Sequence, residues 1–148
     1  MPTPKTNWIR RVLAHGATWR WLLGTYWLVL LVATHLPTSF PALPPEGVDK
    51  LIHFGAYAIF AFLLAMAWQA SAGKLNKYHL WVVWLALCIY AAFDELTQIP
   101  VGRHASFEDW LADAVGAAVG LAVFLLWQRA RRQETQHSTR AAEDVPPQ

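Results

Sequence analysis

Four long apolar runs dominate the chain and constrain its fold more than any other feature. They cover residues 19–36, 51–70, 78–93 and 110–127, and the charged residues gather between them. A helix needs roughly 17–25 apolar residues to cross the hydrocarbon core of a bilayer. Only 15% of the 148 residues are charged, whereas soluble domains carry about 25%. The runs therefore predict helices that lie in a membrane.

We predict an all-α fold, a four-helix transmembrane bundle, because lipid offers no water to satisfy free backbone N–H and C=O groups. The third run is the shortest, and we expect its helix to continue through residues 94–98 until Pro100 stops it. Four buried helices of one soluble domain are the alternative, and the shortage of charge argues against it. We expect no separate soluble domain within these 148 residues, and we therefore expect the bundle and its outer loops, residues 37–48 and 99–108, to carry the function.

The basic residues divide unevenly between the two sides of the predicted bundle. Ten of the twelve lie before the first run, between the second and third, or after the fourth, which leaves only Lys50 and Arg103 on the other side. Cytoplasmic loops are enriched in Lys and Arg, so both termini are predicted to be cytoplasmic. Residues 1–18 form a basic cytoplasmic lead, and residues 129–148 a polar, disordered cytoplasmic tail. Since topology explains the basic residues, no nucleic-acid partner is predicted.

Acidic residues concentrate on the opposite, extracytoplasmic side. Capping is one role predicted for some of them, and it leaves a second role open: Asp49 lies where the second helix begins, and the sequence Ser106-Phe107-Glu108-Asp109 resembles a capping box that opens the fourth helix. Three helix ends thus bring polar groups to one membrane face. Seven of the ten acidic residues lie there, namely Glu46, Asp49, Asp94, Glu95, Glu108, Asp109 and Asp113.

Asp94 and Glu95 are not explained by capping. They lie at the carboxyl end of the third helix, where the helix dipole disfavours an anion by about 0.3–1 kcal/mol. Two adjacent carboxylates there need cations or shared protons, and Gln98 can share a helix face with both. They serve either a functional site or a structural ion-pair network. The available partners are Lys50, Arg103 and His53.

Helical spacing places further polar residues on packed faces. Asp109, Asp113, Gly116 and Gly120 lie on one face of the fourth helix, and the two glycines form a G-x-x-x-G motif for close helix packing. Asp113 should therefore face the bundle interior, since an Asp facing lipid is costly. On the second helix, Asp49, His53 and Tyr57 are spaced four apart and share a face, and Gly55 and Ala56 offer a small surface for close approach.

No cofactor motif is present, and no metal site is predicted, because the chain lacks H-E-x-x-H and C-x-x-C spacings. His53 with Glu95 and Asp113 could nevertheless supply a set of nitrogen and oxygen ligands. Ser106 is the only serine in the outer cluster and lacks a G-x-S-x-G context, so a serine nucleophile is not predicted.

Taken together, these segments resemble the VanZ-like family of bacterial integral membrane proteins. The resemblance rests on residues 49–57 (DKLIHFGAY), on 94–98 (DELTQ), on Arg103 with 106–109 (SFED), and on the Gly116/Gly120 pair. It covers roughly residues 20–128 and implies a four-helix membrane domain, residues 19–128, that passes several times through the bacterial cytoplasmic (inner) membrane. Many members carry Asn where this sequence has Asp113. The named member is associated with low-level resistance to the glycopeptide teicoplanin, so the resemblance implies a link to antibiotic resistance.

Two functions follow from the polar cluster. The first is binding of the anionic head group of a lipid-linked cell-envelope precursor, with Arg103 and Lys50 as cationic contacts. The second is a membrane-embedded hydrolase or transferase, for which the catalytic candidates are His53, Glu95 and Asp94. Transport is less favoured, because no span is interrupted by proline. The oligomeric state is not predicted. The predicted ligand-binding residues are Asp49, Lys50, His53, Tyr57, Asp94, Glu95, Gln98, Arg103, Asp109 and Asp113.

Overall fold

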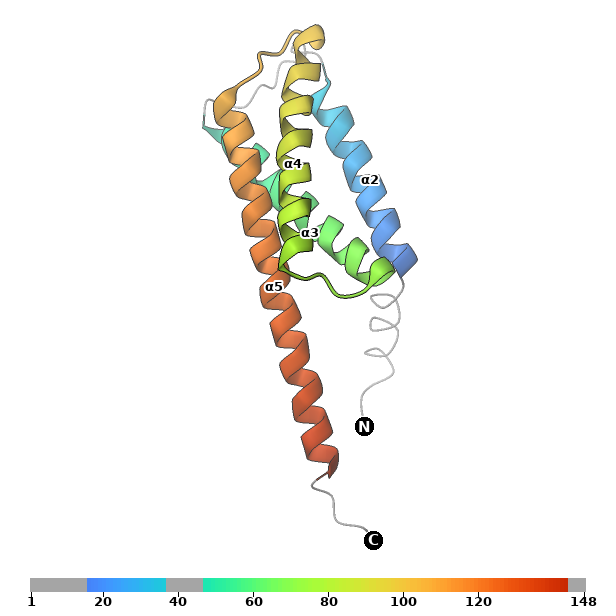
Figure 1. The fold of residues 1–148 in the computed structure, drawn as a ribbon. Helices are drawn as coiled ribbons and strands as arrows, with labels where there is room; N and C mark the ends of the chain where they lie inside the picture. The colour runs from blue at the N-terminus through green and yellow to red at the C-terminus, as the bar shows by residue number, and fades with distance from the viewer. Residues whose placement is uncertain (1–15, 37–46, 144–148) are drawn as a thin grey trace.

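The computed structural model describes residues 16–36 and 47–143, with side chains up to residue 138, and these residues form an all-helical bundle with no strand among them. The helices run alternately up and down (Figure 1). The predicted fold class is confirmed. Most of the predicted loop 37–48, including Glu46, lies outside the described residues. The helices are α2 (Gly16–Thr34), α3 (Val48–Ala72), α4 (Lys77–Gln98) and α5 (Phe107–Glu143), with a short 3₁₀ helix, η1 (Ile99–Val101), after α4.

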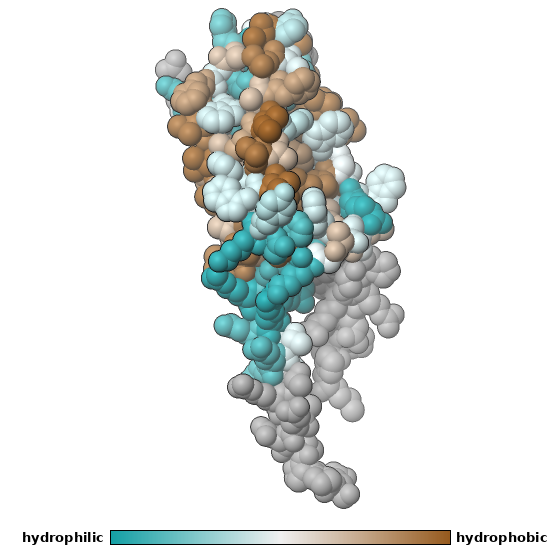
Figure 2. Space-filling model, viewed as in Figure 1, coloured by the Kyte–Doolittle hydropathy of each residue, from teal (hydrophilic) through white to brown (hydrophobic). Residues whose placement is uncertain are grey.

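Three of these helices, α3, α4 and α5, are long and apolar enough to cross a membrane. The 19-residue helix α2 is not among them, and Arg20 with the neighbouring tryptophans lowers the hydropathy of its first half. Large apolar side chains face outward along the bundle, as at Leu51, Ile89 and Leu126, each more than 60% exposed. Figure 2 shows hydrophobic residues over the bundle and hydrophilic ones over the protruding part of α5. Such a surface is stable against lipid, so the chain is a membrane protein.

Among the described helices, α3 and α5 share the most extensive interface, and two glycines permit it. A Cβ atom at Gly116 would overlap the carbonyl oxygen of Phe54, and one at Gly120 would overlap that of Ala58. The G-x-x-x-G motif therefore brings the two backbones together as predicted. Gly55 takes no part in this contact, since a Cβ there would meet nothing within 4 Å. The part of α3 that approaches α5 most closely at these glycines is its backbone at Phe54 and Ala58.

Local sequence sets the boundaries of α4. Its first turn is closed by a reciprocal pair, in which the His79 N–H donates to Asn76 Oδ1 at 2.9 Å and the Asn76 N–H donates to His79 Nδ1 at 3.3 Å. The helix continues through residues 94–98 and ends at Gln98. Pro100 cannot continue it, and the chain enters η1. This confirms the predicted extension of the third helix.

Helix α5 extends far beyond the bundle (Figure 1). It reaches Glu143, whereas residues 129–148 were predicted to be disordered, so the structure differs from that prediction over residues 129–143. The prediction relied on the missing apolar period. Alanine, arginine, glutamine and glutamate are good helix formers, and a segment that extends an existing helix avoids the cost of nucleation.

The described basic residues lie at the two ends of the bundle as predicted. Arg20 at the start of α2, Lys74 and Lys77 in the turn between α3 and α4, and the arginines after Trp127 lie at the end where α2 and α4 begin. Lys50 and Arg103 lie at the opposite end. The start of α2 and the end of α5 thus point to the same side of the bundle. That this side is cytoplasmic remains a prediction from the charge distribution.

Candidate functional site

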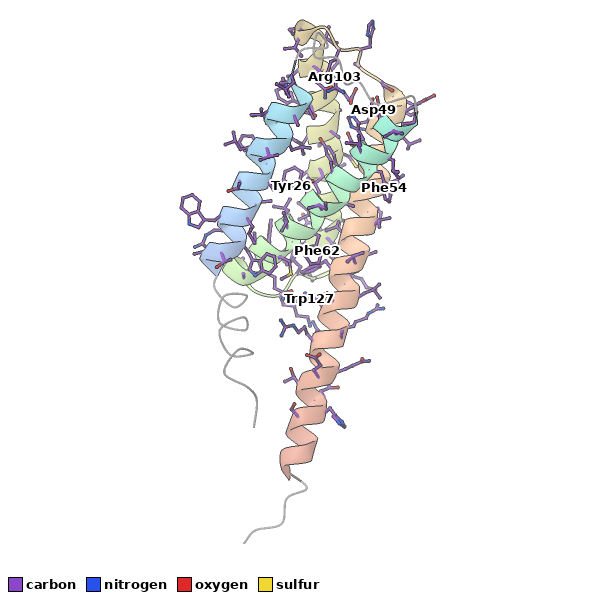
Figure 3. The ribbon with its side chains drawn as sticks, turned by 180° about the vertical axis from the view of Figure 1, so that it is seen from behind. Tyr26, Asp49, Phe54, Phe62, Arg103 and Trp127 are labelled. Carbon is purple, nitrogen blue, oxygen red and sulfur yellow. The ribbon has the colours of Figure 1, made fainter. Side chains whose placement is uncertain are left out.

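Buried polar side chains gather at the end of the bundle where α2 and α4 finish and α3 and α5 begin, which we call the polar end (Figure 3). Buried charged groups are expensive in a membrane unless they are partnered, so such a concentration indicates a network or a site. At most 8% of each side chain is exposed. The group comprises Thr34, His53, Asp94, Glu95, Gln98 and Asp113.

His53 and Asp113 form the centre of this group. Asp113 is fully buried on the glycine-lined face of α5, so the close approach of α3 brings it to His53. Asp113 Oδ1 lies 3.1 Å from His53 Nδ1, and Glu95 Oε1 of α4 lies 4.0 Å from the same nitrogen. Three helices therefore contribute one imidazole and two carboxylates to a single buried cluster.

Glu95 also closes the start of α5. Its Oε2 accepts the backbone N–H of Ser106 at 2.7 Å, and Ser106 Oγ in turn accepts the N–H of Asp109 at 3.2 Å. The serine half of the predicted capping box is thus present. The acceptor for the Ser106 N–H comes from Glu95 of another helix, so the two helix ends are joined.

Asp94 belongs to a second network, which links α2 to α4. Its Oδ1 accepts a hydrogen bond from Thr34 Oγ1 at 3.3 Å, and its Oδ2 accepts one from Gln98 Nε2 at 3.0 Å. The side chain of His35 extends the network, with Nε2 3.1 Å from Thr97 Oγ1. We call Thr34, His35, Asp94, Thr97 and Gln98 the Asp94 network. The Asp94 carboxylate accepts hydrogen bonds from two neutral donors, Thr34 and Gln98, and contacts no described Lys or Arg.

Arg103 lies over the polar end because of the turn that follows α4. Gly102 adopts a left-handed conformation with φ 83°, which sends the chain back so that the Arg103 N–H bonds the carbonyl of Gln98 at 3.2 Å. The guanidinium reaches the carbonyl of Thr34 at 3.4 Å and Asp49 Oδ1 at 3.9 Å. Figure 3 shows Arg103 and Asp49 at this same end. Both contacts are long for an arginine.

Lys50 is paired differently. Its Nζ lies 2.7 Å from Glu108 Oε2 in a surface contact that joins the first turns of α3 and α5. Neither Lys50 nor Arg103 forms an ion pair with Asp94 or Glu95 in the described structure. Of the three cations expected to partner those acids, only His53 approaches one of them.

The remaining predicted site residues also lie at the polar end. Tyr57 is 1% exposed and lies one helical turn after His53 on the same face of α3. Asp109 and Asp49 are half-buried. Asp49 makes no capping hydrogen bond, since α3 begins after Gly47 without a side-chain cap. Its place in the first turn still puts its charge near the positive end of the helix dipole.

Thr34 and His35 are the site residues that sequence reasoning missed. Both lie at the end of the first apolar run, where a Thr-His pair precedes Pro37. Their predicted position, at the same end of the bundle as the acidic cluster, could have identified them as site residues. The Glu95–Ser106 link had no such signal, because one of its two partners is a backbone group.

A pocket of about 340 Å³ opens at the polar end between α4 and α5. Most of its lining is apolar, and Glu95 is its only charged residue. The pocket thus connects the apolar outer surface with a carboxylate of the buried cluster. It is lined by Ala92, Glu95, Leu96, Ala105, Ser106, Phe107 and Trp110.

Two overlapping sets of side chains in the described residues have the spacing to hold a metal ion. The ligand atoms of His53, Glu95 and Asp113 lie within 4.8 Å of one another, and all three residues are buried. A more exposed set, Asp49, His53 and Asp109, meets the same distance limit. The spacing alone does not distinguish these sets from ordinary acidic clusters.

A comparison with models of protein families finds a match for this chain. No curated protein and no solved structure matches the chain. The model of the VanZ/LLP1 family matches residues 3–128, from ahead of α2 to the last buried turn of α5. This chain, a membrane protein with its buried polar groups at one end of a helical bundle, therefore belongs to the VanZ/LLP1 family.

Proposed function

We propose that this protein binds the anionic head group of a lipid-linked cell-envelope molecule at its polar end. The observation that carries the proposal is the incomplete bonding of Arg103. A guanidinium offers five N–H donors, and the described contacts of this one are a hydrogen bond of 3.4 Å and an ion pair of 3.9 Å. Its planar fork suits a phosphate or carboxylate, and 19% of its side chain is exposed.

The neighbouring pocket supports a lipid-linked ligand over a free anion. Its apolar walls, formed by Leu96, Phe107 and Trp110 among others, are continuous with the outward-facing apolar side chains of α4 and α5. A molecule with an apolar chain and a charged head would meet both kinds of surface at the polar end. Because ten of twelve basic residues belong to the opposite side, we place the polar end outside the bacterial cytoplasmic membrane.

Arg103→Ala should weaken binding of a polyprenyl monophosphate about tenfold or more, because a charge-assisted hydrogen bond contributes about 1.5–3 kcal/mol and each 1.4 kcal/mol is tenfold. Native mass spectrometry of the detergent-purified protein measures this. The uncharged polyprenol is the control ligand, and Arg129→Ala, at the other end of α5, is the control variant. Equal binding of the phosphate by Arg103→Ala and wild type would contradict the proposal.

Resistance to teicoplanin would follow only if the bound head group belonged to a wall precursor. Expressing wild type and Arg103→Ala in a susceptible bacterium and measuring the inhibitory concentration of the antibiotic addresses that consequence separately from binding.

A membrane-embedded hydrolase or transferase is the second candidate, and the His53–Asp113 contact favours it. A carboxylate 3.1 Å from an imidazole nitrogen orients the ring, as in sites where histidine acts as a general base. We then expect phosphate release from a polyprenyl diphosphate that depends on pH and is lost in both His53→Ala and Glu95→Gln. His137→Ala, on the exposed part of α5, is the control. Release no faster than in protein-free detergent would rule this candidate out for that substrate.

A further inference from the structure

The buried carboxylates at the polar end outnumber the cations that reach them. Asp94, Glu95 and Asp113 are each at most 5% exposed, and among the described residues Lys50 and Arg103 form ion pairs with Glu108 and Asp49 instead. Among the described side chains, His53 approaches Glu95 and Asp113, and His35 lies in the Asp94 network. Carboxylates in a low-dielectric interior need a positive charge or a proton beside them.

Two of the atoms in this cluster also lack any partner. Asp113 Oδ2 and Tyr57 Oη are buried side-chain atoms without a hydrogen bond in the described structure. Asp113 is fully buried and Tyr57 is 1% exposed. Tyr57 lies one helical turn after His53 on the same face of α3. Buried polar atoms are almost always paired, so something polar or charged belongs beside them.

From this geometry we propose that His53, Glu95 and Asp113 bind a divalent transition-metal cation such as Zn²⁺. Their ligand atoms lie within 4.8 Å of one another. In a tetrahedral zinc site with ligands at about 2.0–2.1 Å, neighbouring ligand atoms are roughly 3.3 Å apart. The observed separations from His53 Nδ1, 3.1 Å to Asp113 and 4.0 Å to Glu95, span that value.

The donor set selects the class of metal. Imidazole nitrogen suits zinc and its first-row neighbours, whereas Mg²⁺ and Ca²⁺ take oxygen ligands alone. Three protein ligands leave a fourth position open, as in catalytic zinc sites, and Glu95 also lines the apolar pocket. The metal would therefore be reachable from the side on which a lipid-linked ligand enters.

We assign the ion to this set rather than to Asp49, His53 and Asp109. Asp49 is half-buried and already lies 3.9 Å from Arg103, and neither of its oxygens is a buried atom without a partner. The three residues of the proposed site come from three different helices, α3, α4 and α5. The sequence indicates these three residues as a possible set of nitrogen and oxygen ligands, but no metal site was predicted, because residues from three helices form no local motif.

The test is a Zn²⁺ titration of the full chain in detergent, purified through a tag without histidine and first treated with a chelator. We expect one equivalent of Zn²⁺ by calorimetry and by elemental analysis. Affinity should fall at least tenfold in Asp113→Asn and in Glu95→Gln, and should be unchanged in Glu108→Gln and Asp109→Asn. Arg103→Ala should keep its zinc, so failure of head-group binding and failure of the metal site are separable.

A second measurement on wild type guards against variants that do not fold. Co²⁺ in place of Zn²⁺ should give visible absorption bands of a four- or five-coordinate site, and adding Zn²⁺ should abolish them. The inference is overturned if the wild type binds no stoichiometric Zn²⁺ or Co²⁺, because water or a proton would then satisfy the cluster. It is also overturned if Asp109→Asn loses the metal while Asp113→Asn keeps it.

Discussion

Replacing Gly120 by alanine is expected to destabilise the protein by about 1–3 kcal/mol, the usual cost of forcing an extra methyl group into a packed interface. The added Cβ would overlap the carbonyl oxygen of Ala58 and lie 2.8 Å from its carbonyl carbon. These are backbone atoms, so α3 and α5 must separate. Separation would also pull Asp113 away from His53, because their contact lies on the same interface as that of Gly120 with Ala58. Unfolding followed by tryptophan fluorescence in detergent measures the loss, and Gly116→Ala should behave alike.

Gly55→Ala is the matched control for this change. It lies on α3 in the same helix pair, and its Cβ would meet nothing within 4 Å. Because alanine is favoured over glycine in a helix interior by about 0.8–1.0 kcal/mol, Gly55→Ala should be neutral or stabilising. The two substitutions are identical in chemistry and opposite in expected sign. A Gly120→Ala protein that unfolds at the same temperature as Gly55→Ala would show that the helices are not in contact there.

Asp94→Leu is expected to cost about 1–3 kcal/mol, because it leaves a buried amide donor without an acceptor. Gln98 is 2% exposed and donates to Asp94 Oδ2 at 3.0 Å. The Thr34 hydroxyl suffers less, since it can donate to the carbonyl of Leu31 at 3.2 Å. The substitution also removes the contact by which the carboxylate joins the end of α2 to α4. The same thermal measurement in detergent reports the loss.

Asp94→Asn distinguishes the contribution of the hydrogen bonds to stability from that of the negative charge. The asparagine oxygen can accept from one neighbour, and the Gln98 amide can turn to accept from the new NH₂ group. Removing one of three buried carboxylates also relieves their mutual repulsion. Asp94→Asn should therefore be at least as stable as wild type, and Asp94→Leu less stable than both. If leucine were tolerated as well as asparagine, the hydrogen bonds of the Asp94 network would contribute nothing to stability.

The sequence indicated which residues share a helix face more reliably than which residues pair. Spacings of three and four placed Asp113 with Gly116 and Gly120, and Asp94 with Gln98, and the structure confirms both relations. Such pairs depend only on the helical repeat. The expected cation partners of Asp94 and Glu95 were mostly wrong, because Lys50 and Arg103 are bound to Glu108 and Asp49. The sign of a charge does not show with which of several nearby opposite charges a side chain will pair.

The tail of α5 shows a different limit. Residues after 128 have no apolar face, so hydrophobic periodicity predicts no helix there. Their helix propensity, and the helix already formed before them, both favour one. The structure continues α5 to Glu143. Helix propensity therefore explains the structure of this segment, which the hydrophobic pattern did not predict.

The sequence by itself determined the membrane setting, the helical class and the concentration of acids at one end, because hydropathy, helical period and charge distribution are properties of the chain alone. Only the tertiary structure decided that His53, Glu95 and Asp113 meet. They come from three helices, and their meeting depends on the close approach of α3 to α5 at Gly116 and Gly120 and on the hydrogen bond from the Ser106 N–H to Glu95. Backbone contacts of this kind have no signature in a single sequence, since any residue supplies an N–H or a carbonyl.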